Sequence, residues 1–193
     1  TRLTFAEGIE NTEPQVITPN ELVLSEPLTI TLSGSGEGVK YYVYGMGELE
    51  GIYDNAGNAI QAAADISGVV ISSDQAYIWE SGNRDLAYSI EAEPFRTQDG
   101  ETSLAACERY MEQYNAHQVD LTGCTLDQVL YVINKGCPVI AMTDSSHAIL
   151  LTGYTRTDIT YIDPETGEEE TVSVNDMEDM VSGSGNAFIG YIQ

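Results

Sequence analysis

The sequence predicts an α+β fold, with helices early in the chain and a meandering antiparallel sheet late. Residues 103–114 and 125–134 carry apolar side chains at the three- and four-residue spacing of buried helix faces. From Pro138 onward, short β-type runs alternate with polar turns. With 193 residues, 42% of them hydrophobic, the chain can bury a sizeable core.

The N-terminal part predicts a small α/β unit. Residues 55–65 form a helical pattern with a small-residue face, largely of alanine. Short runs rich in Val, Ile, Leu and Tyr predict strands at residues 22–24, 28–32, 41–44, 69–72 and 76–79. We therefore expect an added unit in residues 1–95 and a second domain in residues 96–193, or alternatively one continuous domain.

The middle of the chain predicts a short strand at residues 86–91 and then the two helices. In the helix at 103–114, Leu104, Cys107 and Met111 share one face.

The helix at 125–134 has Thr125 or Cys124 at its N-cap, and Gly136 follows its end in the position that favours glycine. After it, the pattern predicts five strands and a short acidic helix at 174–181. The strands are expected at residues 139–142, 148–154, 159–162, 170–174 and 187–191.

Charge excludes several classes of function. The chain has 31 Asp and Glu against 7 Lys and Arg, a formal net charge of −24. Such a surface repels nucleic-acid phosphates and anionic lipids, and it attracts cationic partners. No run of about eighteen apolar residues is present, so we expect no membrane insertion.

The chain starts at Thr1 without a Met or a signal peptide, which is typical of a trimmed sequence. Together with the acidity, this leads us to expect an extracellular or cell-surface protein, such as a bacterial surface protein. Its oligomeric state is not predicted.

The cysteines and histidines do not predict a metal site. Cys107, Cys124 and Cys137 are an odd number, so at least one thiol is free or paired with another chain. Their spacing matches no zinc signature, only two histidines are present, and we expect no cofactor. A calcium site around Asp163, Glu165 and 168–170 is a minor alternative, because this run lacks an EF-hand pattern.

One run of motifs carries a family resemblance. A helix leads into Gly136-Cys137-Pro138-Val139, then His147 opens a strand that ends in Gly153-Tyr154, and the next strand ends in Asp163-Pro164. This order resembles the papain-like cysteine peptidases of the C39 type over about seventy residues. The resemblance implies a papain-like fold with helices packed on a C-terminal antiparallel sheet.

The resemblance also implies a catalytic pair. His147 would be the general base and Asp163 the carboxylate that orients it. The spacing supports this pairing, because sixteen residues joined by a short hairpin bring the two to one end of paired strands. Read singly, a histidine at a strand start and an Asp-Pro turn are ordinary structural features.

For the nucleophile, the resemblance implies a cysteine at the N-terminus of a long helix, which here would be the helix at 103–114, with a glutamine ahead of it. Cys107 is our candidate, but it falls about one turn inside the helix and is followed by Glu108. Alternatively, Cys107 is a small buried residue of the core. Thr102 and Ser103 stand where the nucleophile of the family would be.

The other candidates match less well. Cys124 could cap a helix, but the helix that it would cap is not the one that carries the nucleophile in the family. Cys137 takes the variable place in the Gly-x-Pro motif, and His117 lies in a polar loop exposed to solvent.

Two functions follow from this pattern. The first is a cysteine-peptidase-like hydrolase that acts on peptides through Cys107, His147 and Asp163. The second is a catalytically inactive relative that binds peptide or a partner protein.

Overall fold

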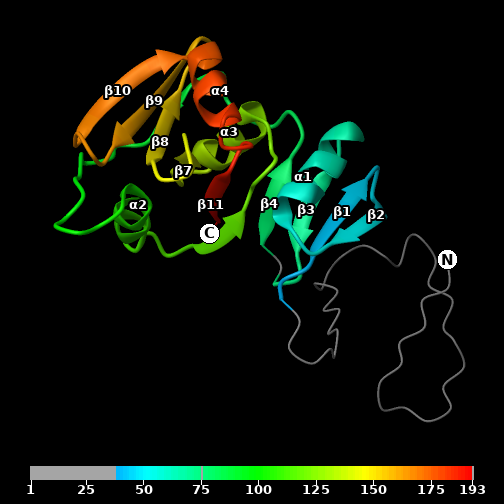
Figure 1. Cartoon of the computed structure of the whole chain (residues 1–193). Helices are drawn as coiled ribbons and strands as arrows, with labels where there is room; N and C mark the ends of the chain where they lie inside the picture. The colour runs from blue at the N-terminus through cyan, green and yellow to red at the C-terminus, as the bar shows by residue number, and fades with distance from the viewer. Residues whose placement is uncertain (1–37, 75, 193) are drawn as a thin grey trace, which may run out of the picture. The chain divides into compact units, whose positions relative to one another are not determined.

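The computed structural model describes residues 38–74 and 76–192. Residues 38–193 form one compact unit. The strands predicted at 22–24 and 28–32 lie outside the described residues, and the domain division at residue 95 stays a prediction. The described residues form an α+β fold with two antiparallel sheets and four helices (Figure 1).

The smaller sheet confirms the predicted N-terminal α/β unit. Its strands run in the order β2-β1-β3-β4, with bounds β1 Tyr41–Gly45, β2 Glu48–Tyr53, β3 Val69–Ser72 and β4 Tyr77–Glu80. Helix α1, Ala56–Asp65, packs against all four strands (Figure 1). Its first turn is capped by Asn55, whose side chain accepts a hydrogen bond from the Asn58 amide.

Strand β2 was not expected from the sequence. Its residues are exposed or half-buried and include two glutamates and a glycine, so the apolar signal of a strand is weak. The turn before it identifies it instead. Met46 and Gly47 both have positive φ, 50° and 85°, which is the backbone of a tight two-residue hairpin turn.

The larger sheet is antiparallel throughout and has the order β10-β9-β8-β7-β11-β6, with β5 added beside β8. The bounds are β5 Tyr88–Ser89, β6 His117–Asp120, β7 Val139–Met142, β8 Ala148–Tyr154, β9 Asp158–Asp163, β10 Glu168–Ser173 and β11 Phe188–Ile192. Strand β8 lies in the middle of the sheet and all seven of its residues are buried, which explains why its sequence is mostly apolar.

Strand β6 corrects the prediction of a polar loop around His117. Its one apolar residue, Val119, is buried, and the strand forms by pairing with β11 at the edge of the sheet. Pairing with a strand distant in sequence supplies the backbone hydrogen bonds that a local pattern cannot reveal. His117 itself is exposed, as expected.

Three helices pack on the larger sheet, as the sequence predicts. Their bounds are α2 Ser103–Met111, α3 Leu126–Asn134 and α4 Val174–Ser182. Helix α2 contacts β7 and β8, and α4 contacts β9 and β10. Helix α2 ends three residues earlier than predicted, because its last backbone bonds tighten into a turn in which the Tyr114 amide donates to the Met111 carbonyl.

Helix α3 joins the two sheets. Thr125 is its N-cap and forms a reciprocal capping box with Gln128. The indole N–H of Trp79, on β4, donates to the Gln128 carbonyl over 3.0 Å. No helix of the described residues is long and apolar enough to span a membrane.

Candidate functional site

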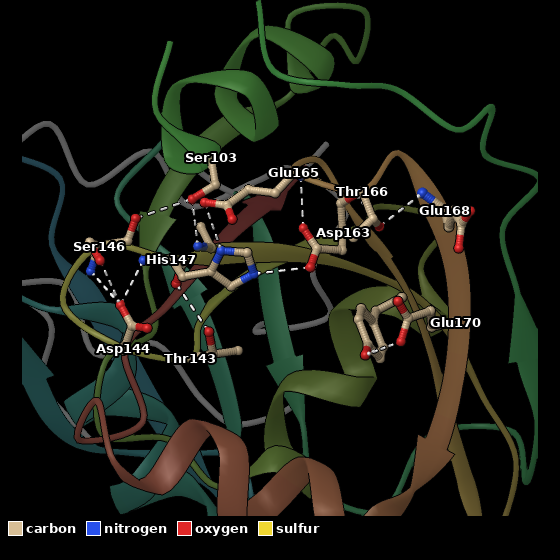
Figure 2. A network of polar contacts seen from close by, with 12 residues as sticks. Ser103, Thr143, Asp144, Ser146, His147, Asp163, Glu165, Thr166, Glu168 and Glu170 are labelled. Atoms are coloured by element: carbon tan, nitrogen blue, oxygen red, sulfur yellow. Dashed lines mark hydrogen bonds and ion pairs between the residues drawn. The ribbon is translucent and has the colours of Figure 1, made fainter. Parts of the chain in front are cut away.

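The register of β8 and β9 brings His147 and Asp163 together. The strands are antiparallel, with Leu150 opposite Ile162. His147 directly precedes β8 and Asp163 is the last residue of β9, so both lie at the same end of the pair. The Nε2 atom of His147 is 3.2 Å from Oδ2 of Asp163, and both side chains are about four-fifths buried, with 20% and 17% exposed (Figure 2).

The loop before His147 is fixed by Asp144. Its Oδ1 atom accepts hydrogen bonds from the amides of Ser146 and His147, at 2.7 and 2.8 Å. These bonds, led by the Ser146 amide, lower the pKa of Asp144. Our interpretation of the sequence missed Asp144. An Asp side chain that accepts hydrogen bonds from amides two or three residues later is a common feature of turns.

The turn after Asp163 places a second carboxylate on the histidine. Oδ1 of Asp163 accepts from the Glu165 amide at 2.8 Å. The side chain of Glu165 then reaches back, so that its Oε1 lies 3.2 Å from Nδ1 of His147 (Figure 2). The sequence indicated Glu165 only as a calcium ligand, because a contact across a turn leaves no spacing signal.

Gly167 closes the same turn. Its amide donates to the Asp163 carbonyl at 2.7 Å, and its φ of +67° is in the region that favours glycine. A Cβ at this position would lie 2.3 Å from Cγ of Arg96. The turn that carries both carboxylates therefore favours glycine here.

The N-terminus of α2 reaches the same place through Ser103. Thr102 caps the helix by accepting from the Ala105 amide, and Ser103 is its first residue, only 2% exposed. The Ser103 hydroxyl donates to the Ser146 carbonyl at 3.2 Å and accepts from the Ala148 amide at 2.9 Å. It thus binds the backbone on both sides of His147 (Figure 2).

Cys107 lies one turn further along α2, in the core. Its side chain is fully buried. Burial first, and then the negative charges of Asp163, Glu108 and Glu101, raise the pKa of Cys107 to about 12. Among the described residues, no hydrogen bond or ion pair joins it to His147.

The predicted site is therefore assembled in part. His147 and Asp163 are in contact, whereas Cys107 is on the buried side of a helix that begins at Ser103. The catalytic roles assigned to these three residues stay predictions.

The other two cysteines are also buried and free. Burial raises the pKa of Cys124 to about 12, with a contribution from Asp120, and raises that of Cys137 as well. The Cys124 thiol lies 3.8 Å from the carbonyl of Gly57, on α1.

An ion pair braces the segment that leads into α2. Glu101 accepts from Nε and Nη2 of Arg109 at 2.8 and 3.0 Å, and Nη2 also donates to the Arg96 carbonyl. The Gln98 amide donates to Glu101 at 2.7 Å. The Arg109 guanidinium, helped by this amide, lowers the pKa of Glu101 to about 2.

Three of the carboxylates considered for a calcium site contact other side chains. Asp163 and Glu165 contact His147, and Glu170 accepts from the Tyr161 hydroxyl at 2.9 Å. In the described part of the chain, no group of three or more His, Cys, Asp or Glu side chains is arranged to hold a metal ion.

A family model and a solved structure were found to be similar to this chain. The model of the Peptidase_C39 like family matches residues 59–182, more than half of the chain. A solved structure from Bacillus anthracis, described as a C39-like peptidase, is 17% identical with a TM-score of 0.38. The alignment covers 49% of this chain and 60% of that one. No curated protein matches the sequence.

The matched region runs from α1 to the end of α4 and includes Ser103, Cys107, His147 and Asp163. The α+β architecture, with helices on an antiparallel sheet and a histidine and an aspartate at its end, is the papain-like fold that the sequence predicts. The chain belongs to the Peptidase_C39 like family.

Proposed function

We propose that this peptidase-like domain is catalytically inactive and binds an extended peptide or a partner protein segment near His147 and Asp163. The observation that carries the proposal is the residue at the N-terminus of α2. A papain-like enzyme needs a thiolate there, activated by the helix and by a neighbouring histidine. Here that residue is Ser103, and its hydroxyl is engaged with the Ser146 carbonyl and the Ala148 amide.

The environment of Cys107 supports the same proposal. A nucleophilic cysteine needs a lowered pKa and access to substrate, whereas Cys107 is fully buried with a pKa raised to about 12. Attack by this sulfur would require α2 to move away from β8.

The second candidate function is an active cysteine peptidase that uses Cys107, His147 and Asp163. The 3.2 Å contact between His147 and Asp163 favours it, because an orienting carboxylate is what a catalytic histidine requires.

Peptide hydrolysis separates the two functions. The intact chain is incubated with a mixture of fluorogenic peptides, beside Cys107→Ala and His147→Ala variants. We expect no cleavage above that of the variants. Hydrolysis by the unmodified chain that both substitutions abolish would establish the active peptidase and refute our proposal.

Charge suggests the class of segment to be bound. With a net charge of −24 and three carboxylates close to His147 in Asp144, Asp163 and Glu165, the domain favours cationic segments. The test is a ¹H–¹⁵N NMR titration with a lysine-rich ten-residue peptide and its glutamate-rich counterpart. Shifts around His147 are expected with the first alone, and equal shifts with both would contradict a charge-selected site.

We also propose that the domain acts outside the cell or at its surface, on the basis of its acidity. Fractionation of the producing cells with an antibody against the domain tests this. Recovery of the protein in the cytosol would contradict it.

A further inference from the structure

The histidine of the site contacts a carboxylate through each ring nitrogen. Nε2 faces Asp163 and Nδ1 faces Glu165, both at 3.2 Å (Figure 2). A neutral imidazole has one N–H donor and one lone pair, so it can satisfy one carboxylate only. The imidazolium has two donors and satisfies both, so this geometry suits a cationic ring between two anions.

One residue organises both contacts. Asp163 uses Oδ2 for the ring and Oδ1 to accept from the Glu165 amide at 2.8 Å. The backbone of Glu165 is thereby held within reach of the ring, although its side chain is 60% exposed. The hydrogen bond that the His147 amide donates to Asp144 fixes the backbone that carries the ring.

The N-terminal residue of α2 provides no anion. In a cysteine peptidase of this architecture, the thiolate at the helix N-terminus pairs with the imidazolium. The Ser103 hydroxyl is neutral, and it binds the backbone of Ser146 and Ala148 instead. The negative partner on the second ring nitrogen comes from Glu165.

We propose that Glu165 is an internal counter-ion that takes the electrostatic place of the missing thiolate and holds His147 through Nδ1. Glu165 is thus a positioning residue, and it competes with any thiolate for the imidazolium. This inference rests on the proposed function, since it assumes that the chain has no cysteine nucleophile at the site.

Restoring a thiol tests the competition. Three variants are compared: Ser103→Cys, Ser103→Cys with Glu165→Gln, and Ser103→Cys with Glu168→Gln. The last is a matched control, because Glu168 is an exposed carboxylate of the same turn region with no contact to the ring. Each is treated with iodoacetamide at pH 6 and at pH 10, and modification of the introduced thiol is followed by peptide mapping. Because residue 103 is only 2% exposed, the rate at pH 6 is divided by the rate at pH 10, which cancels the accessibility of the thiol. A thiol that reacts at neither pH is followed instead by its thiolate absorbance near 240 nm.

In this reaction the thiol loses its proton to solvent, and the sulfur displaces iodide from the reagent carbon. The rate follows the thiolate fraction, which rises when the imidazolium is free to pair with sulfur. We expect alkylation about tenfold faster with Glu165→Gln than with Ser103→Cys alone, equivalent to a shift of one pKa unit in the introduced thiol. With Glu168→Gln the rate should stay within about twofold of Ser103→Cys alone.

Equal rates in all three variants would overturn the inference, and so would equal acceleration by the two glutamate substitutions. If circular dichroism shows that the thiol variants do not fold, Glu165→Gln is made in the unmodified chain. The ¹⁵N shift of Nδ1 of His147 should then move while that of Nε2 is retained. An unmoved Nδ1 signal would be equally decisive against the counter-ion.

Failure of the proposed function is recognised separately. Peptide hydrolysis that depends on Cys107 refutes the inactive domain, whatever the alkylation rates. Absence of hydrolysis together with equal alkylation rates rejects the role of Glu165 alone.

Discussion

Nε2 of His147 lies 3.2 Å from Oδ2 of Asp163, at the common end of β8 and β9. The contact depends on the strand register, because a slip of one residue would turn one of the two side chains to the opposite face of the sheet. It also joins two anchored turns, since Asp144 caps the amide of His147 and Asp163 caps the amide of Glu165. The pair therefore holds the two turns together, whether or not it takes part in a reaction.

Replacement of Asp163 should destabilise the fold. Asp163→Ala removes both the ring contact and the cap on the Glu165 amide, and we expect a loss of about 1–3 kcal/mol in the free energy of unfolding. Urea unfolding followed by circular dichroism measures it. Asp99→Ala is the matched control, because Asp99 is exposed and makes none of these contacts. Equal effects of the two substitutions would mean that only net charge matters.

Ser103 should contribute to stability as a tether. In Ser103→Ala the buried amide of Ala148 loses its partner, and an unsatisfied buried donor costs about 1–3 kcal/mol. The control is Ser145→Ala, since Ser145 is exposed in the same loop, and its effect should stay within about 0.5 kcal/mol. Chemical denaturation compares the two. An unchanged midpoint for Ser103→Ala would show that the hydroxyl is dispensable.

Much of the fold could be predicted because its core strands and helices carry strong local patterns. Strand β8 is wholly buried and mostly apolar, and α3 has a capping box and a following glycine. The pair of His147 and Asp163 was accessible for the same reason, because a short hairpin between paired strands fixes their relation.

The remaining features depend on partners distant in sequence or on side-chain direction. Strand β2 has no fully buried residue and β6 has a single apolar one, and the two form by pairing with β1 and β11. The contact of Glu165 with Nδ1 arises because a turn reverses the chain, which no periodicity records. The hydroxyl bonds of Ser103 likewise join residues more than forty positions apart.

The domain should not bind nucleic acid at physiological salt. Its net charge of −24 repels the phosphate backbone, whose neutralisation by Lys and Arg supplies most non-specific affinity. Fluorescence anisotropy with labelled single- and double-stranded DNA at 50 and 150 mM salt provides the measurement. Micromolar binding that weakens as salt increases would contradict this prediction.

The three thiols should resist modification in the folded protein. Burial raises the pKa of Cys107 and Cys124 to about 12, so both stay neutral and inaccessible at pH 8. Cys137 should react first, because it lines a cavity of about 280 Å³ beside Lys135 and Tyr191. Iodoacetamide labelling with and without guanidinium, read by mass spectrometry, gives the order. Rapid labelling of native Cys107 that is lost in His147→Ala would instead support the active peptidase.

The same shift gives an alkaline limit to stability. The pKa of Cys107 is raised from 9.0 to about 12 in the folded state, so folding favours the neutral thiol. Its contribution to stability is complete below pH 9 and is lost as the pH rises from about 9 to about 12. Melting temperatures of Cys107→Ala should therefore fall less steeply than those of the unmodified chain across this range.

Glu101 should contribute to the loss of stability at acid pH. The Arg109 guanidinium, with the Gln98 amide, lowers the pKa of Glu101 from 4.5 to about 2, so the folded state favours the carboxylate. Its contribution to stability is present above pH 4.5 and is lost as the pH falls toward about 2.

Glu101→Gln removes this contribution at every pH. The melting temperatures of the variant and of the unmodified chain should therefore differ at pH 7 and converge between about pH 4.5 and pH 2. Calorimetry across this range measures the convergence. Asp99→Asn is the control, because it removes an exposed carboxylate of the same segment without breaking an ion pair. A difference between Glu101→Gln and the unmodified chain that is constant with pH would mean that the ion pair with Arg109 does not hold the segment leading into α2.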